Sequence, residues 1–149
     1  MVGITTIEQD TYTTLRSLIN ANLPSYTYNG IEITYTLLSE FPYETPTFPL
    51  IIVNECKVSV KLLNLDGSGE EYTIEIQIDF YAKAIHGKKA ISVGRDSLRN
   101  TFINNLSNFD IDNGLLPKDD FWDDSNVSVF EAGNELLNIG SVMIVFVRK

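Results

Sequence analysis

The chain of 149 residues has an apolar fraction of 44% and a charged fraction of 21%, which predicts one globular domain over residues 1–149 and argues against disorder. Its formal charge of −9, from 11 basic and 20 acidic residues, argues against a basic surface that grips nucleic-acid phosphates. The lone cysteine, Cys56, excludes an internal disulfide, and we expect no signal peptide, no membrane helix and a soluble protein made in a reducing cytoplasm.

The first predicted element is a helix that ends before Pro24, because proline cannot continue a helical hydrogen-bond ladder. Apolar side chains recur on one of its faces: Ile7, Tyr12, Leu15, Leu18 and Ile19. A turn at Asn29-Gly30 then leads into IEITYTLL, residues 31–38, where apolar and polar side chains alternate. This alternation predicts one half-buried strand.

The segment FPYETPTFPLIIV, residues 41–53, places three prolines within eight positions and then becomes entirely apolar. Each proline removes a backbone donor and pushes the residue before it toward extended geometry. We expect an extended arm over residues 41–49, which delivers LIIV, residues 50–53, into the core as a strand.

Residues 57–63 and 72–82 predict a long β-hairpin with a glycine-rich tip. The apolar side chains of the second strand share one face: Tyr72, Ile74, Ile76, Ile78 and Phe80. Its other face carries Glu75, Gln77 and Asp79, so we expect one side of the sheet to be wet or to meet a polar partner.

A second helix is predicted between positions 90 and 107, and its apolar stripe consists of Val93, Leu98, Phe102 and Leu106. Residues 110–125 are acidic and predict an irregular loop. Residues 127–133 and 136–149 predict two final strands, and the apolar run VMIVFV in the second predicts burial on both faces. The order of elements predicts an α+β domain with a mainly antiparallel sheet, two principal helices packed on one face and a long β-hairpin.

The hairpin tip has the oxygen-ligand spacing of a calcium-binding EF-hand loop, from Asn64 through Asp66 and Ser68 to Glu75. An EF-hand needs helices on both flanks, whereas both flanks here alternate as strands. We therefore interpret this segment as a hairpin turn and expect no metal site.

The segment KDDFWDDS, residues 118–125, gathers four carboxylates around Phe121 and Trp122. Aromatic side chains contribute much of the binding energy at protein interfaces, so this segment is a candidate docking loop. The alternative is a solvated loop whose tryptophan folds back onto the core.

Catalysis needs several reactive groups close together, and the sequence offers one histidine, His86, and one thiol, Cys56. A dyad of these two stays open from the sequence, although the β context of Cys56 favours a packed thiol. We expect no enzyme, no catalytic residue and no cofactor.

Charge is distributed unevenly, because residues 83–99 are basic and residues 110–124 are acidic. Opposite charges at separate places on one subunit favour head-to-tail contacts that close into a ring. The alternative is that the two segments neutralise one another within a subunit or face water.

The order of elements resembles the tail-terminator, or tail-completion, proteins of long-tailed bacteriophages. Four features carry the resemblance: the N-terminal helix, the strand TPTFPLIIV, the strand YTIEIQIDFYAK that runs into the helix ISVGRDSLRNTFINNL, and the final strand GSVMIVFVRK. The resemblance covers nearly the whole chain as a pattern of elements, and the acidic segment 110–124 has no counterpart in it.

This resemblance implies a virion structural protein that forms a homo-oligomeric ring, usually a hexamer, at the head-proximal end of the tail tube after assembly in the host cytoplasm. The ring would bind the tail tube protein and a neck or head-completion protein, and genome DNA would pass through its lumen without specific binding. The proline arm would then pack onto a neighbouring subunit. The candidate interface residues are Phe41, Pro42, Tyr43, Pro46 and Phe48 in the arm, and Phe121 and Trp122 in the acidic segment.

Two other interpretations stay open. The first is another virion role, such as a head–tail connector or a baseplate component. The second is a small cytosolic ligand-binding domain or enzyme, whose pocket would have Tyr72, Asp79 and His86 as polar lining.

Overall fold

The structure is a computed structural model that describes residues 4–38, 47–54, 56–63, 69–106, 116–132 and 134–148. Its elements follow in the order α1 (Ile4–Ala21), β1 (Ser25–Tyr28), β2 (Ile31–Thr34), β3 (Thr36–Leu38), β4 (Leu50–Val53), β5 (Lys57–Leu62), β6 (Glu70–Lys83), the short 3-10 helix η1 (Ala84–His86), α2 (Lys89–Asn104), β7 (Leu116–Asp124), β8 (Ser128–Ala132) and β9 (Glu135–Arg148). The two predicted helices and the predicted β5–β6 hairpin are therefore present.

The centre of the fold is a long antiparallel pair of strands, β6 and β9, which stay in register from Tyr72 opposite Arg148 to Lys83 opposite Leu137. Strands β5 and β4 pair with successive parts of the edge of β6 that faces away from β9. Strands β8 and β7 pair with successive parts of the edge of β9 that faces away from β6. Strand β3 pairs with β4 in parallel, whereas the other pairings of this sheet are antiparallel. The predicted α+β fold with a mainly antiparallel sheet is confirmed.

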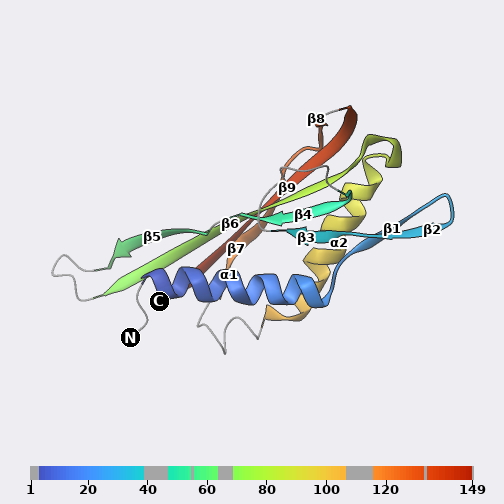
Figure 1. Cartoon of the computed structure of the whole chain (residues 1–149). Coiled ribbons are helices and arrows are strands. Elements are labelled where there is room, and N and C mark those ends of the chain that lie inside the picture. The colour runs from blue at the N-terminus through green and yellow to red at the C-terminus, as the bar shows by residue number, and fades with distance from the viewer. Residues whose placement is uncertain are drawn as a thin grey trace.

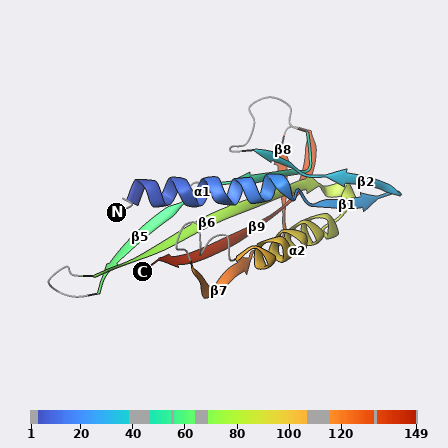
Figure 2. The same ribbon diagram turned by 90° about the horizontal axis from the view of Figure 1, so that it is seen from below.

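Both α-helices cover the same face of the large sheet (Figure 1 and Figure 2). Alternation along β6 and β9 points one set of side chains toward the helices, and these side chains are fully buried: Ile74, Ile76, Ile78, Phe80, Val142, Ile144 and Phe146. Leu15 and Ile19 of α1 and Ile91, Leu98 and Phe102 of α2 complete this core. Each such burial contributes about 1.5–3 kcal/mol, so the core supplies the main stabilisation.

The sequence analysis predicted that both faces of the apolar run in β9 are buried, and this prediction is wrong. Val142, Ile144 and Phe146 are buried, whereas Met143, Val145 and Val147 between them are only half-buried. Because side chains alternate along a strand, the second set points to the sheet face opposite the two helices. The continuous apolar run therefore belongs to a strand whose one face is buried against the helices and whose other face is only partly covered.

Helix α2 approaches the sheet closely because two glycines leave room for it. A Cβ atom added to Gly140 on β9 would lie 2.5 Å from Cγ2 of Ile91, and one added to Gly94 on α2 would lie 2.9 Å from the ring of Tyr35. The Tyr35 hydroxyl donates a buried hydrogen bond of 2.8 Å to the carbonyl oxygen of Ala90. These contacts fix the position of α2 along the sheet.

The prediction of one strand over residues 31–38 is wrong, because the chain leaves the first pairing at Tyr35. Asn29 and Gly30 have φ values of 51° and 77°, the left-handed geometry that a two-residue hairpin turn requires. They join β1 to β2 in a separate two-stranded sheet, which projects from the body of the molecule (Figure 1). The buried Tyr35 then turns the chain into β3.

The prediction of an irregular acidic loop is wrong for residues 116–124, which form β7 and pair with β9. The register shifts between Pro117 and Trp122, so the strand carries a bulge or irregularity. The strand forms because Phe121 and Trp122 pack against the core cluster while the carboxylates of Asp123 and Asp124 reach solvent. Strand pairing here outweighs the low strand preference of aspartate.

Candidate functional site

Exposed apolar side chains gather on strand β8 and the start of β9. Val129, Phe130 and Leu136, which we call the β8 surface, have exposed fractions between 43% and 61%. Val129 and Leu136 are diagonal neighbours on one face of the ladder, and Phe130 lies on the other face, where its ring contacts Tyr81. Among the described residues β8 has β9 as its only strand partner, so β8 is an edge strand of this part of the sheet.

A second set of exposed apolar side chains lies on strand β5 and on the residue that follows it. Val60, Leu62 and Leu63, which we call the β5 surface, have exposed fractions between 44% and 59%. Val60 and Leu62 share one face of the strand because they are two residues apart. Among the described residues β5 has β6 as its only strand partner, so this strand too has an open edge.

The two surfaces lie at diagonally opposite corners of the large sheet. Strand β5 pairs with the first residues of β6, whereas β8 pairs with the part of β9 that faces the last residues of β6. The two strands also flank different edges of the β6–β9 pair (Figure 1). A contact between them could therefore join two copies of the chain but not two parts of one copy.

The predicted arm residues Phe41, Pro42, Tyr43 and Pro46 lie outside the described residues. Phe48, the last predicted anchor of the arm, is buried within its own subunit, and its role as an interface anchor stays a prediction. Its cluster also contains Leu50, Leu137, Leu38 and Tyr81. The register places Leu50, Tyr81 and Leu137 on the sheet face opposite the helices, so the end of the arm covers one part of that open face.

The predicted docking residues Phe121 and Trp122 both pack onto the core. The ring of Phe102 stacks on Phe121 at a centroid distance of 5.7 Å and lies 6.2 Å from Trp122. The indole Nε1 of Trp122 donates a hydrogen bond of 2.8 Å to Asp124 on the same strand. The structure therefore supports the alternative in which the tryptophan folds back, rather than the docking loop.

The acidic and basic segments meet within one subunit where the structure describes them. The carboxylate of Asp124 lies 3.9 Å from Nε of Arg95 and 3.8 Å from Nη1 of Arg99. The buried Arg95 also donates hydrogen bonds through Nη1 to the carbonyl oxygens of Ser125, at 2.7 Å, and Ser141, at 3.3 Å. This arrangement favours internal neutralisation over head-to-tail attraction between the two segments.

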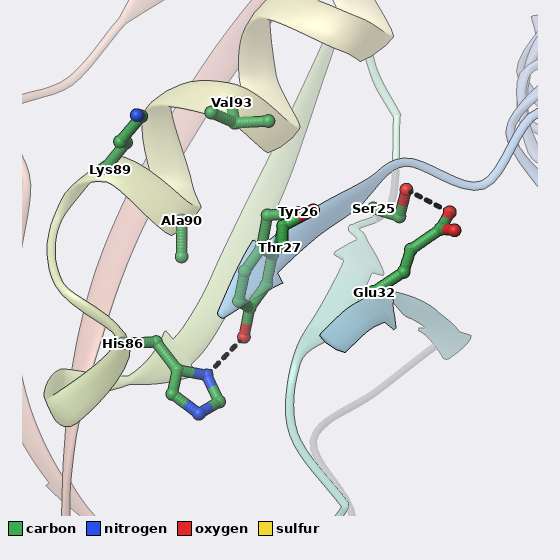
Figure 3. Close-up of a pocket in the computed structure, with 8 residues that line it drawn as sticks. All are labelled: Ser25, Tyr26, Thr27, Glu32, His86, Lys89, Ala90 and Val93. Carbon is green, nitrogen blue, oxygen red and sulfur yellow. Dashed lines mark hydrogen bonds between the residues drawn. The ribbon is translucent and has the colours of Figure 1, made fainter. Parts of the chain in front are cut away.

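A pocket of about 410 Å³ lies between the β1–β2 hairpin and the start of α2 (Figure 3). Eight residues line it: Ser25, Tyr26 and Thr27 of β1, Glu32 of β2, His86 of η1, and Lys89, Ala90 and Val93 of α2. Its volume is within the range of small-molecule sites. The pocket combines an apolar wall with a cation, a carboxylate and an imidazole.

His86 is fixed in this pocket by two tyrosines of β1. Its Nδ1 lies 2.6 Å from the hydroxyl of Tyr26, and its ring lies 4.3 Å from the ring of Tyr28. Burial, followed by the nearby charge of Lys83, lowers the pKa of His86, and burial raises the pKa of Tyr26 to about 12. We assign the hydroxyl proton of Tyr26 as the donor to Nδ1, which places the ring proton of neutral His86 on Nε2.

The other groups considered as catalytic or pocket residues do not join His86. Cys56 is buried in the core next to the first half of β6, whereas His86 follows the end of that strand, roughly 20 Å further along it. Asp79 points to the open face of the sheet, where it accepts hydrogen bonds from Asn54, Gln77 and Ser141. Tyr72 lies at the far end of β6 and bonds to the Glu70 carboxylate. A Cys56–His86 dyad is therefore excluded.

Within the described parts of the chain, no group of three or more histidine, cysteine or acidic side chains is placed to hold a metal ion. The residues of the EF-hand-like spacing from Asn64 to Ser68 lie outside the described residues, but their flanks are the predicted strands β5 and β6. In the same described parts, no helix combines the length and the apolar character that crossing a membrane requires.

Sequence reasoning identified His86 but missed Tyr26 and Lys89 as its companions in the pocket. The available signal was SYTY, residues 25–28, which alternates directly before the turn at Asn29-Gly30 and so predicts the first strand of a hairpin.

When the chain is compared with known proteins, no family model and no curated protein matches it.

Proposed function

We propose that this chain is a structural subunit of a virion, the tail terminator of a long-tailed bacteriophage, which assembles in the host cytoplasm into a ring at the head-proximal end of the tail tube. The observation that carries the proposal is the pair of exposed apolar surfaces on open edge strands, the β5 surface and the β8 surface. The order of elements, which resembles that family along nearly the whole chain, supports the proposal of a virion role for the ring.

Two different surfaces on one subunit favour a head-to-tail contact. When the β8 surface of one copy meets the β5 surface of the next, an open assembly always keeps one free surface at each of its two ends. Such an assembly ends only if the rotation between neighbours closes it into a ring. The diagonal placement of β5 and β8 at opposite ends of the sheet suits this geometry.

The contact would combine apolar burial with strand pairing. The six side chains of the two surfaces are about half exposed, so covering them contributes on the order of 5 kcal/mol in total. Association costs about 4–15 kcal/mol in lost translational and rotational freedom, so this burial offsets only the lower part of the cost. Hydrogen bonds between the open edges of β5 and β8 would supply the rest, as in other strand-addition complexes.

The remaining partners follow from the same role. The tail tube protein would bind one side of the ring, and a neck or head-completion protein would bind the other. Genome DNA would pass through the lumen, where a subunit charge of −9 repels phosphates and prevents retention. In this function the chain makes and breaks no covalent bonds.

The test measures the assembly state of the wild-type chain over a range of concentrations by light scattering and negative-stain electron microscopy. We expect closed rings of one size at high concentration. Leu62→Asp on the β5 surface and Leu136→Asp on the β8 surface should each abolish the rings, because each places a charge in the contact. Ile31→Asp, at an equally exposed apolar residue of the β1–β2 hairpin, is the matched control and should leave the rings intact. Wild-type protein that stays monomeric throughout would overturn the proposal.

A further inference from the structure

The exposed apolar side chains of strand β5 point to the face of the large sheet that carries the helices. Val60 lies opposite Tyr72 of β6, and Tyr72 packs against the core beneath the helices. Leu62 shares this face because it is two residues further along the strand. The other face of β5 carries exposed polar side chains: Lys57, Ser59 and Lys61. The apolar area of this strand therefore lies on one side of the sheet.

Strand β8 and the start of β9 present exposed aliphatic side chains on that same face. Val129 lies opposite Asn138, and Asn138 lies opposite Ala82, which belongs to the core beneath the helices. Leu136 shares this face because it is two residues from Asn138. Apart from Phe130, which points to the opposite face, the β8 surface therefore faces the same way as the apolar side of β5.

Within one subunit, strands β5 and β8 run in opposite directions. Strand β5 is antiparallel to β6, β6 is antiparallel to β9, and β9 is antiparallel to β8. The two strands also flank opposite edges of the β6–β9 pair (Figure 1). A neighbour placed beside β8 with its helices on the same side therefore brings its β5 antiparallel to β8, whereas a neighbour that is turned over brings its β5 parallel to β8. The direction of pairing and the side of the helices are thus coupled.

We propose that neighbouring copies join β8 to β5 antiparallel, with α1 and α2 of every copy on the same side of one continuous sheet. This inference rests on the proposed function, because a ring of three or more copies relates neighbours by at most a third of a turn, which falls short of the half-turn that turns a subunit over. In this arrangement the apolar side of β5 meets Val129 and Leu136. A turned-over neighbour would instead set the lysines of β5 against these two side chains.

Phe130 is accommodated by the same arrangement. Its ring points to the face opposite the helices, where the lysines of the neighbouring β5 also point. The methylene stems of these lysines can cover the ring while their ammonium groups reach water. Both faces of the contact therefore bury apolar area, and no ammonium group is buried.

Cross-linking of the assembled protein tests on which side the neighbour's helices lie. The native Cys56 is buried, so covalent dimers report the introduced cysteines. Val129→Cys is mixed in turn with six variants, each with one new cysteine at a position of β5 between 57 and 62, and light scattering verifies that rings form. The thiol cross-linker has a reach of about 5 Å, the separation of Cβ atoms in directly opposite pairs. Each variant treated alone is the control.

We expect a covalent dimer with cysteine at one or more of the three positions on the helix-facing side: Val58, Val60 and Leu62. The positions on the other side, Lys57, Ser59 and Lys61, should give none. A dimer at one of these latter positions, in rings that form normally, would overturn this inference and leave the proposed ring standing. Rings that give no dimer at any of the six positions would also overturn it. A wild-type chain that forms no rings would overturn both this inference and the proposed function.

Discussion

Replacing Gly140 by alanine places a methyl group in the contact between β9 and α2. The added Cβ would lie 2.5 Å from Cγ2 of Ile91 and 3.1 Å from Nη1 of Arg95, whereas ordinary contacts of this kind begin near 3.4 Å. Ile91 is completely buried and its Cγ2 sits close to the helix backbone, so it cannot move aside without shifting α2. Arg95 would also be pushed from its hydrogen bonds to two backbone carbonyls.

Two effects of opposite sign determine how much Gly140→Ala changes the free energy of unfolding. Overpacking of a well-packed core costs about 1–3 kcal/mol. Exchanging a glycine for alanine in a strand returns about 0.5–1 kcal/mol, because the unfolded chain loses conformational freedom. We therefore expect Gly140→Ala to lower the free energy of unfolding by about 1–2 kcal/mol, measured by urea denaturation with an unchanged slope against denaturant.

A double-mutant cycle with Ile91→Ala tests whether the contact between the new methyl group and Ile91 causes the loss of stability in Gly140→Ala. Ile91→Ala alone should cost about 2–5 kcal/mol, as a large-to-small change in a core. In that background Gly140→Ala should cost nothing or stabilise the protein, which gives a coupling energy of at least about 1 kcal/mol between the two sites. A neutral Gly140→Ala variant, or equal costs in both backgrounds, would refute the close approach of α2 to the sheet.

Two further predictions concern His86 and Trp122. Because burial lowers the pKa of folded His86, the unfolded chain binds the proton more readily below pH 6.5, so wild-type stability is full above this pH and falls as the pH drops through it. Urea denaturation of His86→Gln between pH 8 and 5 should lack this component, and a stability difference between the two proteins that does not change with pH would contradict the assigned environment. Trp122→Ala should lower the free energy of unfolding by about 2 kcal/mol, roughly half the usual cost of removing a core tryptophan, because its ring packs against Phe102. Its assembly state by light scattering should match wild type, and a loss of assembly without a loss of stability would restore the docking interpretation.

Strong periodicity allowed the regular parts of the fold to be predicted from the sequence. The alternation of residues 72–82 predicted both β6 and its buried face, and the stripe on residues 90–107 predicted α2. In both segments the local pattern and the tertiary burial agree, so nothing overrides the local signal.

The errors arose where tertiary contacts decided the outcome. The alternation of residues 31–38 continues through Tyr35, but the burial of Tyr35 beneath α2 divides the segment between two sheets. The carboxylates of β7 concealed a strand, because pairing with β9 and packing on Phe102 are long-range contacts. The run VMIVFV indicated apolar character without showing which face is covered.

The candidate sites were harder to predict for the same reason. Tyr26, His86 and Lys89 come from β1, η1 and α2, and only the hairpin geometry brings Tyr26 to His86. The β5 and β8 surfaces consist of ordinary strand residues, whose exposure depends on the absence of a further strand beside them among the described residues. An apolar residue on an edge strand and one on a central strand look alike in a sequence.

Sedimentation equilibrium of a mixture of Leu62→Asp and Leu136→Asp most directly tests whether the β5 surface of one copy binds the β8 surface of another. Each variant retains one intact surface, so each should be monomeric alone, and the mixture should form a one-to-one dimer that grows no further. A mixture that stays monomeric at every concentration, or a single variant that still forms dimers by itself, would contradict head-to-tail assembly.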